Sequence, residues 1–213
     1  MENRRRYDRL APLYDRVDLA EILYKRKLRP RLFQGLGGII LEAGAGTGNN
    51  IPFYPAGARI VALDVSPGML SRARARSERL GRRVDLVAMD VLQAGFPDAT
   101  FDAVVSAFSF CVLDDEMQRP ALAELARLCK PGGEVRILDY TISRRPVRRF
   151  CMSLWQHWER SIYGATFPRH TERYLAEAGL ELVAEEYLYK DIIRLLTCRL
   201  ATRPGGYRMA EKK

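Results

Sequence analysis

The chain has 213 residues, of which 47% are hydrophobic, and its 35 basic against 26 acidic side chains give a net charge of +9. This length suits one well-buried α/β domain and is short for two. No apolar run approaches the roughly 18 residues that a membrane-spanning helix needs, which excludes that class. The positive charge predicts attraction to a polyanion, either nucleic acid or an anionic membrane face.

The cysteines and histidines give no sign of a metal centre or a disulfide framework. The four cysteines are widely spaced, no Cys-x-x-Cys pair occurs, and there are two histidines. Free thiols and no bound metal are therefore expected. The Arg-rich start is not followed by the hydrophobic segment of a secretory signal, so we expect the protein in the cytoplasm.

Residues 1–35 are predicted to form a helical cap ahead of the main domain at residues 36–213. Apolar side chains recur there at helical spacing: Leu10, Leu13, Tyr14 and Val17. Further apolar residues follow among lysines and arginines. This mixture is typical of a segment that lies in a membrane interface, and equally of a solvated basic helix whose apolar face covers a sheet.

A buried strand at residues 38–43 runs straight into a glycine-dense turn. Three glycines recur at every second position, where nicotinamide and flavin sites show Gly-x-Gly-x-x-Gly: Gly44, Gly46 and Gly48. This tighter spacing suits a ligand without a pyrophosphate, and glycine lets the backbone approach that ligand. The next apolar strand, residues 58–63, leads to Asp64, which can accept hydrogen bonds from both hydroxyls of a ribose.

Helices and strands alternate through the following residues. Ser66 and Pro67 are a good N-cap and first residue for a helix that runs to about Leu80 and stops at Gly81. Beyond it we expect strands at 84–88 and 101–107, a helix at 115–128, a turn at 130–133 and a strand at 134–140. This alternation with short connections predicts a parallel, doubly wound sheet.

The last third is predicted to hold an insertion and then complete the sheet. Residues 142–167 combine arginines, four of them between 144 and 149, with aromatic side chains and are expected to form a helical insertion on the substrate side. A helix at 168–178 should end at Gly179, and strands at 180–189 and 192–201 should form an antiparallel pair.

The order of these motifs resembles that of class I S-adenosylmethionine-dependent methyltransferases. The residues that carry the resemblance are Glu42 to Gly48, Asp64, Met89-Asp90, Phe101 to Val105 and Lys130 to Gly133. The resemblance covers roughly residues 38–140. It implies a seven-stranded, mainly parallel sheet of the Rossmann-like methyltransferase fold.

The resemblance also implies that S-adenosylmethionine binds and S-adenosylhomocysteine is released. Glu42 would receive the methionine ammonium, Asp64 the ribose diol and Asp90 the adenine amine. Val65, Met69 and Val91 would pack near the adenine, and Ser106 would face the ligand crevice. The full set of implied cofactor-binding residues is Tyr7, Tyr14, Glu42, Gly44, Gly46, Gly48, Asp64, Val65, Met69, Asp90, Val91 and Ser106.

The leader from Tyr7 to Asp15 is similar to one shared by bacterial quinone C-methyltransferases and phospholipid N-methyltransferases. In these families it helps to cover the cofactor, which makes Tyr7 and Tyr14 candidates for closing the site. Trp155, Trp158 and the segment 164–171 look most like the phospholipid branch and related thiol methyltransferases. Methylation of phosphatidylethanolamine and its mono- and dimethyl products is therefore the leading hypothesis, with a quinone ring carbon or a small thiol as alternatives.

Aromatic side chains interleaved with arginines favour an anionic phospholipid surface as the partner, at the inner face of the cell membrane. Nucleic acid is not expected, because Ser106 to Phe110 replaces an Asn-Pro-Pro-Tyr-like motif after the fourth strand. A cofactor-binding protein without turnover is disfavoured by the intact motif set. An ammonium acceptor must lose a proton before attack, and the expected acceptors of that proton are Tyr14, Asp139, Tyr140 and His157.

Overall fold

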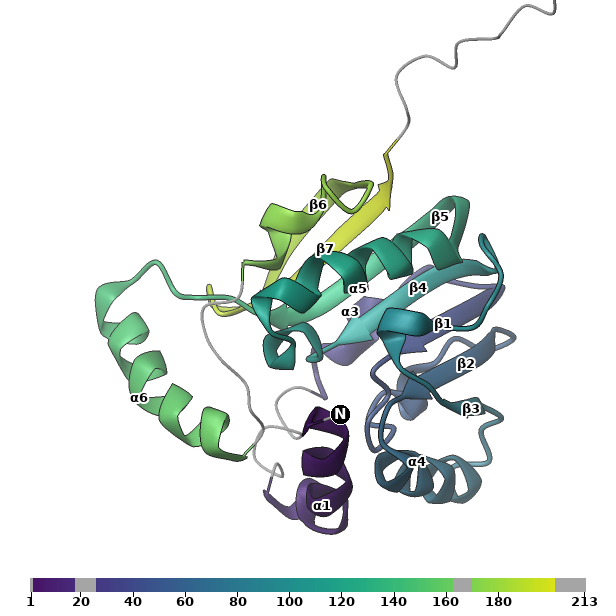
Figure 1. Cartoon of the computed structure of the whole chain (residues 1–213), viewed down its shortest axis with the longest axis horizontal. Helices are drawn as coiled ribbons and strands as arrows, with labels where there is room; N and C mark the ends of the chain where they lie inside the picture. Colours follow the sequence, from purple (N-terminus) through teal and green to yellow (C-terminus); the bar gives the residue numbers. More distant parts are fainter. Residues whose placement is uncertain (1, 18–25, 163–169, 202–213) are drawn as a thin grey trace, which may run out of the picture.

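The computed structural model describes residues 2–17, 26–162 and 170–201. In this part of the chain a seven-stranded sheet has the order β3-β2-β1-β4-β5-β7-β6 (Figure 1). The strands are β1 Ile39–Ala43, β2 Arg59–Asp64, β3 Asp85–Ala88, β4 Phe101–Ala107, β5 Cys129–Tyr140, β6 Leu180–Tyr189 and β7 Ile193–Leu200. The first five are parallel, and β7 runs antiparallel to both β5 and β6. The predicted α/β fold class and its antiparallel final pair are confirmed.

The sheet has its topological switch point at β1. The chain places β2 on one side of β1 and β4 on the other. In open α/β sheets the ligand crevice lies outside the carboxyl ends of the strands at such a point. The turn at Gly44, the end of β2 at Asp64 and the end of β4 at Ala107 all meet at this edge.

Helices cover both faces of the sheet, and alternate strand residues enter two cores. One face packs on α5 and η4, and the other on α3, α4 and η1. Within β1, fully buried Leu41 enters the first core and fully buried Ile40 the second, as the period of two in a strand requires. The helices are α1 Glu2–Val17, α3 Arg29–Phe33, η1 Ile51–Phe53, α4 Pro67–Arg79, η2 Val91–Gln93, η3 Phe110–Val112, α5 Asp115–Leu128, α6 Pro146–Ile162 and η4 Thr171–Tyr174.

The turn expected at residues 130–133 lies inside β5 as an irregularity. Phe101 pairs with Cys129 but Ala103 pairs with Glu134, so the residues between them bulge out opposite Asp102. Gly133 permits this close approach, because a Cβ there would lie 2.6 Å from the Asp102 carbonyl oxygen. The strand therefore starts earlier than the turn residues indicate.

The helix expected over residues 168–178 is wrong. Residues 168 and 169 lie outside the described residues, and from Thr171 the chain makes only the short 3-10 helix η4 and a turn. Thr171, Leu175 and Ala178 are buried against the α5 side, and their spacing is what imitates a helix. Gly179, with a φ of +76°, and the hydrogen bond from the Leu180 N–H to the Leu175 carbonyl turn the chain into β6 at this point.

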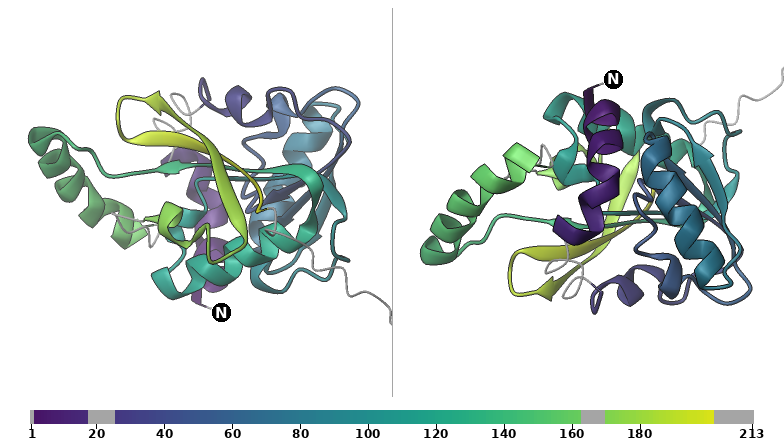
Figure 2. Two further views of the ribbon diagram at one scale, coloured as in Figure 1. Left: turned by 90° about the horizontal axis from the view of Figure 1, so that it is seen from above. Right: turned by 90° about the horizontal axis from the view of Figure 1, so that it is seen from below.

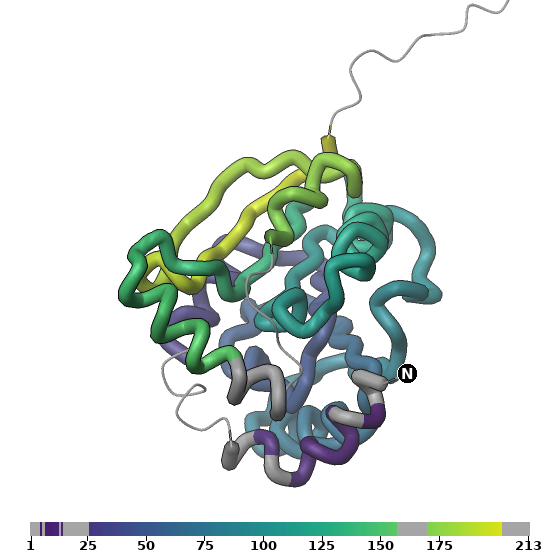
Figure 3. The backbone as a smooth tube through the Cα atoms, turned by 60° about the vertical axis from the view of Figure 1, so that its left-hand side comes forward, coloured from purple at the N-terminus to yellow at the C-terminus, as the bar shows by residue number. Residues whose placement is uncertain are grey.

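The N-terminal cap consists of parts with different surroundings. α1 packs beside α4, as the view from below in Figure 2 and the trace in Figure 3 show. In α3, by contrast, Leu32 is 0% and Phe33 3% exposed, and both pack in the core beneath the sheet. Of the two interpretations of the cap, a segment in a membrane interface or an apolar face that covers the sheet, these two side chains agree with the second.

Helix α6 stands to one side of the sheet in Figure 1 and in both views of Figure 2. Within the segment 142–167, α6 spans Pro146–Ile162, and residues 163–167 lie outside the described residues. That this segment is an insertion on the substrate side stays a prediction. None of the helices in the described residues is long and apolar enough to cross a membrane.

Candidate functional site

The glycine turn after β1 gives each of its glycines a different role. All three have positive φ, which glycine adopts without strain. A Cβ on Gly44 would collide with the Ser109 hydroxyl, and one on Gly48 would lie 2.5 Å from the Ile51 side chain and 3.1 Å from Ala73 of α4. No described atom lies within 4 Å of a Cβ built on Gly46. Gly44 and Gly48 are thus needed for protein packing, and Gly46 faces open space.

Asp64 connects this turn to the start of α4. One carboxylate oxygen accepts a hydrogen bond from the Gly46 N–H at 2.8 Å, and the other from the Ser66 N–H at 2.9 Å. Burial raises the pKa of Asp64 in spite of these two bonds, which act to lower it. The carboxyl group is therefore held at the carboxyl edge of β2, directly beside the open side of the turn.

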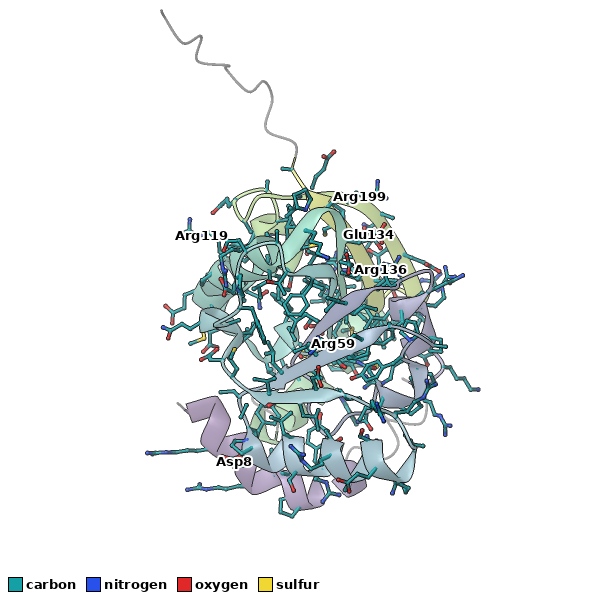
Figure 4. All side chains as sticks on the ribbon, turned by 90° about the vertical axis from the view of Figure 1, so that its right-hand side faces the viewer. Asp8, Arg59, Arg119, Glu134, Arg136 and Arg199 are labelled. Atoms are coloured by element: carbon teal, nitrogen blue, oxygen red, sulfur yellow. The ribbon has the colours of Figure 1, made fainter. Side chains whose placement is uncertain are left out.

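Helix α1 is attached at the same place through Asp8. Its carboxylate accepts from the Ser66 hydroxyl at 2.6 Å and from the Gly68 N–H at 3.1 Å, and Figure 4 shows it between α1 and α4. A Cβ on Gly68 would lie 3.3 Å from Ala11 Cβ, so the glycine makes room for α1. Asp8 lies within the leader from Tyr7 to Asp15, but no motif marked it as a contact to α4.

Glu42 is fully buried in a polar cluster behind the turn. It accepts hydrogen bonds from Asn50 Nδ2 at 2.5 Å and from the Tyr54 hydroxyl. Burial raises its pKa to about 7, against the lowering effect of these bonds and of the Arg29 charge. Near neutral pH this side chain is therefore divided between carboxylic acid and carboxylate.

Arg29 brings a buried positive charge to the same cluster. It is 7% exposed, donates to Asn50 Oδ1 at 2.6 Å and lies 5.2 Å from the centroid of the Phe108 ring, just after β4. Arg29, Asn50 and Tyr54 were not identified from the sequence, because no motif marks them. A guanidinium and a carboxyl group in one cluster complement the two charged groups of an amino acid.

The remaining residues expected around a nucleoside are placed as follows. Asp90 is exposed and caps η2 by accepting from the Leu92 N–H at 2.9 Å. Val65 and Val91 are half-buried, whereas Met69 is 1% exposed. Ser106 is buried and donates to the Ala43 carbonyl at 3.0 Å, so it joins β4 to β1. Their roles toward a ligand stay predictions.

The residues expected to close the site or take a proton do not form one cluster. The Tyr7 and Tyr14 rings of α1 pair at 6.4 Å between centroids, and Tyr140 packs against Phe108 at 5.4 Å. Asp139 is buried, and its two oxygens accept from the backbone N–H groups of Cys111 and of Tyr140. It therefore fixes the turn after β4, which argues against proton removal by this residue. The side chain of His157 lies outside the described residues.

The described part of the chain has no cluster of side chains that could bind a metal ion. It contains no group of three histidine, cysteine or acidic side chains that could hold a metal ion. What the edge of the sheet offers is an open glycine turn, a carboxyl group beside it, and a buried acid and cation behind it. This set suits a ligand that has both a diol and an amino acid portion.

Comparison with known proteins places residues 40–133 in a family model described as a methyltransferase domain. Phosphatidylethanolamine N-methyltransferase of Cereibacter sphaeroides is 39% identical over 106 residues, which are 49% of this chain and 51% of that protein. Demethylmenaquinone methyltransferase of Thermus thermophilus is 32% identical over 142 residues, 63% of this chain and 64% of that protein. The matched part of the chain thus spans between half and two thirds of these relatives.

A solved geranyl diphosphate methyltransferase in complex with SAM superimposes with a TM-score of 0.65 at 14% identity. The superposition covers 84% of this chain and 85% of that one. Because the superposition covers most of the chain, the likeness concerns the fold as a whole rather than the glycine turn alone.

Proposed function

We propose that this chain transfers the methyl group of S-adenosylmethionine to a lipid amine. Its residues 40–133 match the methyltransferase domain model, as the motif order predicted. The observation that supports S-adenosylmethionine as the cofactor is the arrangement of residues at the switch point of the sheet. Gly46 faces open space, and Asp64 is hydrogen-bonded to the backbone of that turn. Both are at the sheet edge where ligands of open α/β folds bind.

The residues present fit this cofactor. Asp64 would accept from the ribose hydroxyls, Glu42 from the methionine ammonium, and Arg29 would bind the methionine carboxylate. When bound, the cofactor supplies an electrophilic methyl group on a sulfonium. The chain's contribution is then to hold that group in line with the acceptor and to exclude water.

Asp64→Ala should weaken the binding of S-adenosylhomocysteine by about 1–3 kcal/mol, because two ribose hydroxyls lose their charged acceptor. The fold should survive, since only two backbone donors lose their partner. Calorimetric titration measures the affinity, and Asp85→Ala at the exposed start of β3 serves as control. An affinity equal to that of the wild type would remove Asp64 from the site.

For the acceptor we propose phosphatidylethanolamine and its partly methylated products, with phosphatidylcholine as the final product. The 39% identical relative carries the name of this activity. A quinone ring carbon is the second candidate, because the 32% identical relative is named for it. The surface of α6 supports an acceptor that is held in a membrane, and the higher identity of the first relative favours the phospholipid.

Helix α6 presents an apolar stripe to solvent. Val147 is 76%, Phe150 63% and Leu154 60% exposed, and their spacing puts them on one face of the helix. Trp155 beside them is 51% exposed. Arg144, Arg145 and Arg149 are exposed near the start of this helix. Apolar side chains flanked by cations complement the headgroup layer of an anionic membrane, at the inner face of the cell membrane in this proposal.

The start of α6 is fixed to the sheet by Asp191, which follows β6. Its carboxylate accepts from the Ser143 hydroxyl at 2.7 Å and the Arg144 N–H at 2.9 Å, and it pairs with Arg148. These bonds hold the pKa of Asp191 below its usual range. If α6 lies in the membrane interface, these bonds connect it to the end of β5, at the edge of the sheet where we propose that the ligands bind.

Replacing Phe150 and Leu154 together by serine should reduce adsorption to phosphatidylglycerol vesicles at least tenfold, because full burial of each side chain is worth about 1.5–3 kcal/mol. Thermal stability should not change, since both are exposed. Sedimentation with vesicles measures the loss, and Val183→Ser on exposed β6 is the matched control. Wild-type protein that stays in the supernatant at low salt would contradict the membrane contact.

The acceptor itself is identified by incubating the protein with labelled S-adenosylmethionine and a total bacterial lipid extract. Labelled phosphatidylethanolamine derivatives, recognised by mass, are the expected result. A labelled quinone would establish the second candidate instead, and labelling only of added thiols would replace both.

A further inference from the structure

His170 belongs to a polar network that the cofactor site does not use. Its Nδ1 lies 3.2 Å from Glu172 Oε1. A carboxylate can only accept, so Nδ1 carries a proton, and in the neutral imidazole Nε2 is then the nitrogen with the free lone pair. This is the arrangement in which a carboxylate orients an imidazole for use as a base.

Glu172 is in turn held by a buried cation. Arg194 of β7 pairs with Glu172 and donates to Glu185 of β6 at 2.6 Å, and its side chain is 8% exposed. Burial alone would raise the pKa of Glu172, but its own backbone N–H and the Arg194 guanidinium bring that pKa below its usual range. Glu172 therefore remains a carboxylate at neutral pH.

The network is at the same edge of the sheet as the cofactor residues. Arg194 is opposite Asp139 in the β5–β7 register, one residue before the end of β5. Asp139 accepts at 2.9 Å from the Cys111 N–H in η3, the turn that follows β4. The carboxyl ends of β4 and β5 are on the same edge of the sheet as the glycine turn after β1 and Asp64 at the end of β2.

A second set of hydrogen bonds connects the segment of His170 to that turn. The Thr171 hydroxyl donates to Gln118 Oε1 at 2.9 Å, and Gln118 Nε2 donates to the Phe110 carbonyl at 2.7 Å. Both side chains are buried. The His170 ring is itself 33% exposed, so a headgroup can reach it and water can remove its proton.

We propose that His170, oriented by Glu172 and Arg194, is the general base that takes a proton from the acceptor ammonium. This rests on the proposed amine acceptor. Nε2 of His170 removes one proton from the ammonium, and the freed lone pair forms the N–C bond to the methyl group. The C–S bond breaks with its electron pair moving to sulfur, which leaves the thioether. The proton on His170 passes to water.

The test compares wild type with His170→Asn, whose amide can still donate to Glu172 but cannot take a proton. At pH 7 the rate of phosphatidylethanolamine methylation should fall about 100-fold or more, with unchanged affinity for S-adenosylhomocysteine. The remaining rate should rise about tenfold per pH unit toward the pKa of a primary amine, about 10, because hydroxide then replaces the base. The rate of the wild type should also rise with pH, but it should reach its plateau at a lower pH than the rate of the variant.

Other charged groups near His170 have to be separated from this effect. Glu172, Arg194 and Glu185 belong to its network. Arg119 of α5 lies 3.9 Å from Glu177, which follows η4 in the chain. Glu177→Gln, in that exposed pair, is the matched control and should keep the wild-type profile. Imidazole added to His170→Gly should restore activity, which a structural role would not allow.

Each outcome has a defined meaning. An active wild type with an equally active, folded His170→Asn variant overturns the base assignment and leaves the proposed function standing. A wild type that methylates no amine overturns the proposed function, and the base with it. A slow variant with the wild-type pH profile and no imidazole rescue also contradicts the base assignment.

Discussion

Gly46→Val should reduce the affinity for S-adenosylhomocysteine at least 100-fold while the protein remains folded. A valine Cβ would occupy the space where no described atom lies within 4 Å, which is where backbone and ligand meet in the proposal. Gly46 also has a φ of +55°, and a β-branched residue there costs about 1–2 kcal/mol. Calorimetric titration gives the affinity, and thermal melting gives the stability.

The variant Gly81→Val separates the effect of backbone strain at a positive φ from the effect of filling the ligand space. Gly81 follows α4, has a φ of +60°, and also has open space around a built Cβ. The Gly81→Val variant should have a melting temperature lowered about as much as that of Gly46→Val, and it should keep the wild-type affinity for S-adenosylhomocysteine. A folded Gly46→Val protein with wild-type affinity would show that the glycine turn is not the cofactor site.

Glu42→Gln should remove a pH dependence of stability on the order of 3 kcal/mol between about pH 4.5 and pH 7 in the ligand-free protein. In the folded state burial raises the pKa of Glu42 from 4.5 to about 7. Between these values the folded chain keeps a proton that the unfolded chain has released. The free energy of unfolding therefore falls as pH rises through this range, and the loss is complete above about pH 7.

Glutamine can keep the contacts to Asn50 and Tyr54, because its amide both accepts and donates. The variant should unfold at higher urea concentration than wild type at pH 8 and at a similar one at pH 4. Glu186→Gln, which changes an exposed partner of Arg31, should retain the wild-type pH dependence. Equal pH slopes for Glu42→Gln and wild type would mean that Glu42 titrates as an ordinary surface acid.

The central part of the fold could be predicted from local sequence. The bounds of β4 and α5 agree with those expected, because strand periodicity, the helix pattern and flanking turn residues all lie within a few positions of each other. The Ser66 N-cap is also confirmed, since its hydroxyl accepts from the Met69 N–H. The same use of local spacing gave the wrong prediction for residues 168–178. The buried positions of this segment have helical spacing, but from Thr171 the chain forms only the short 3-10 helix η4.

The site was only partly predictable, because half of it depends on contacts between distant segments. Asp64 ends β2 and Gly46 lies in the turn after β1, so their places could be predicted from the motif order. Asp8 meets Ser66 across 58 residues, and Arg29 meets Asn50 across 21. His170 likewise gains its role through Arg194, which no spacing rule connects to it. Such pairs become apparent only when the sheet has brought the segments together.

The most direct test of the account is a crystal structure of the protein with S-adenosylhomocysteine bound. We predict the ribose hydroxyls within hydrogen-bonding distance of Asp64, the amino acid portion beside Glu42 and Arg29, and the backbone of Gly46 against the ligand. A ligand bound at another edge of the sheet, or a saturated crystal in which Asp64 and Gly46 do not touch it, would contradict the proposed site.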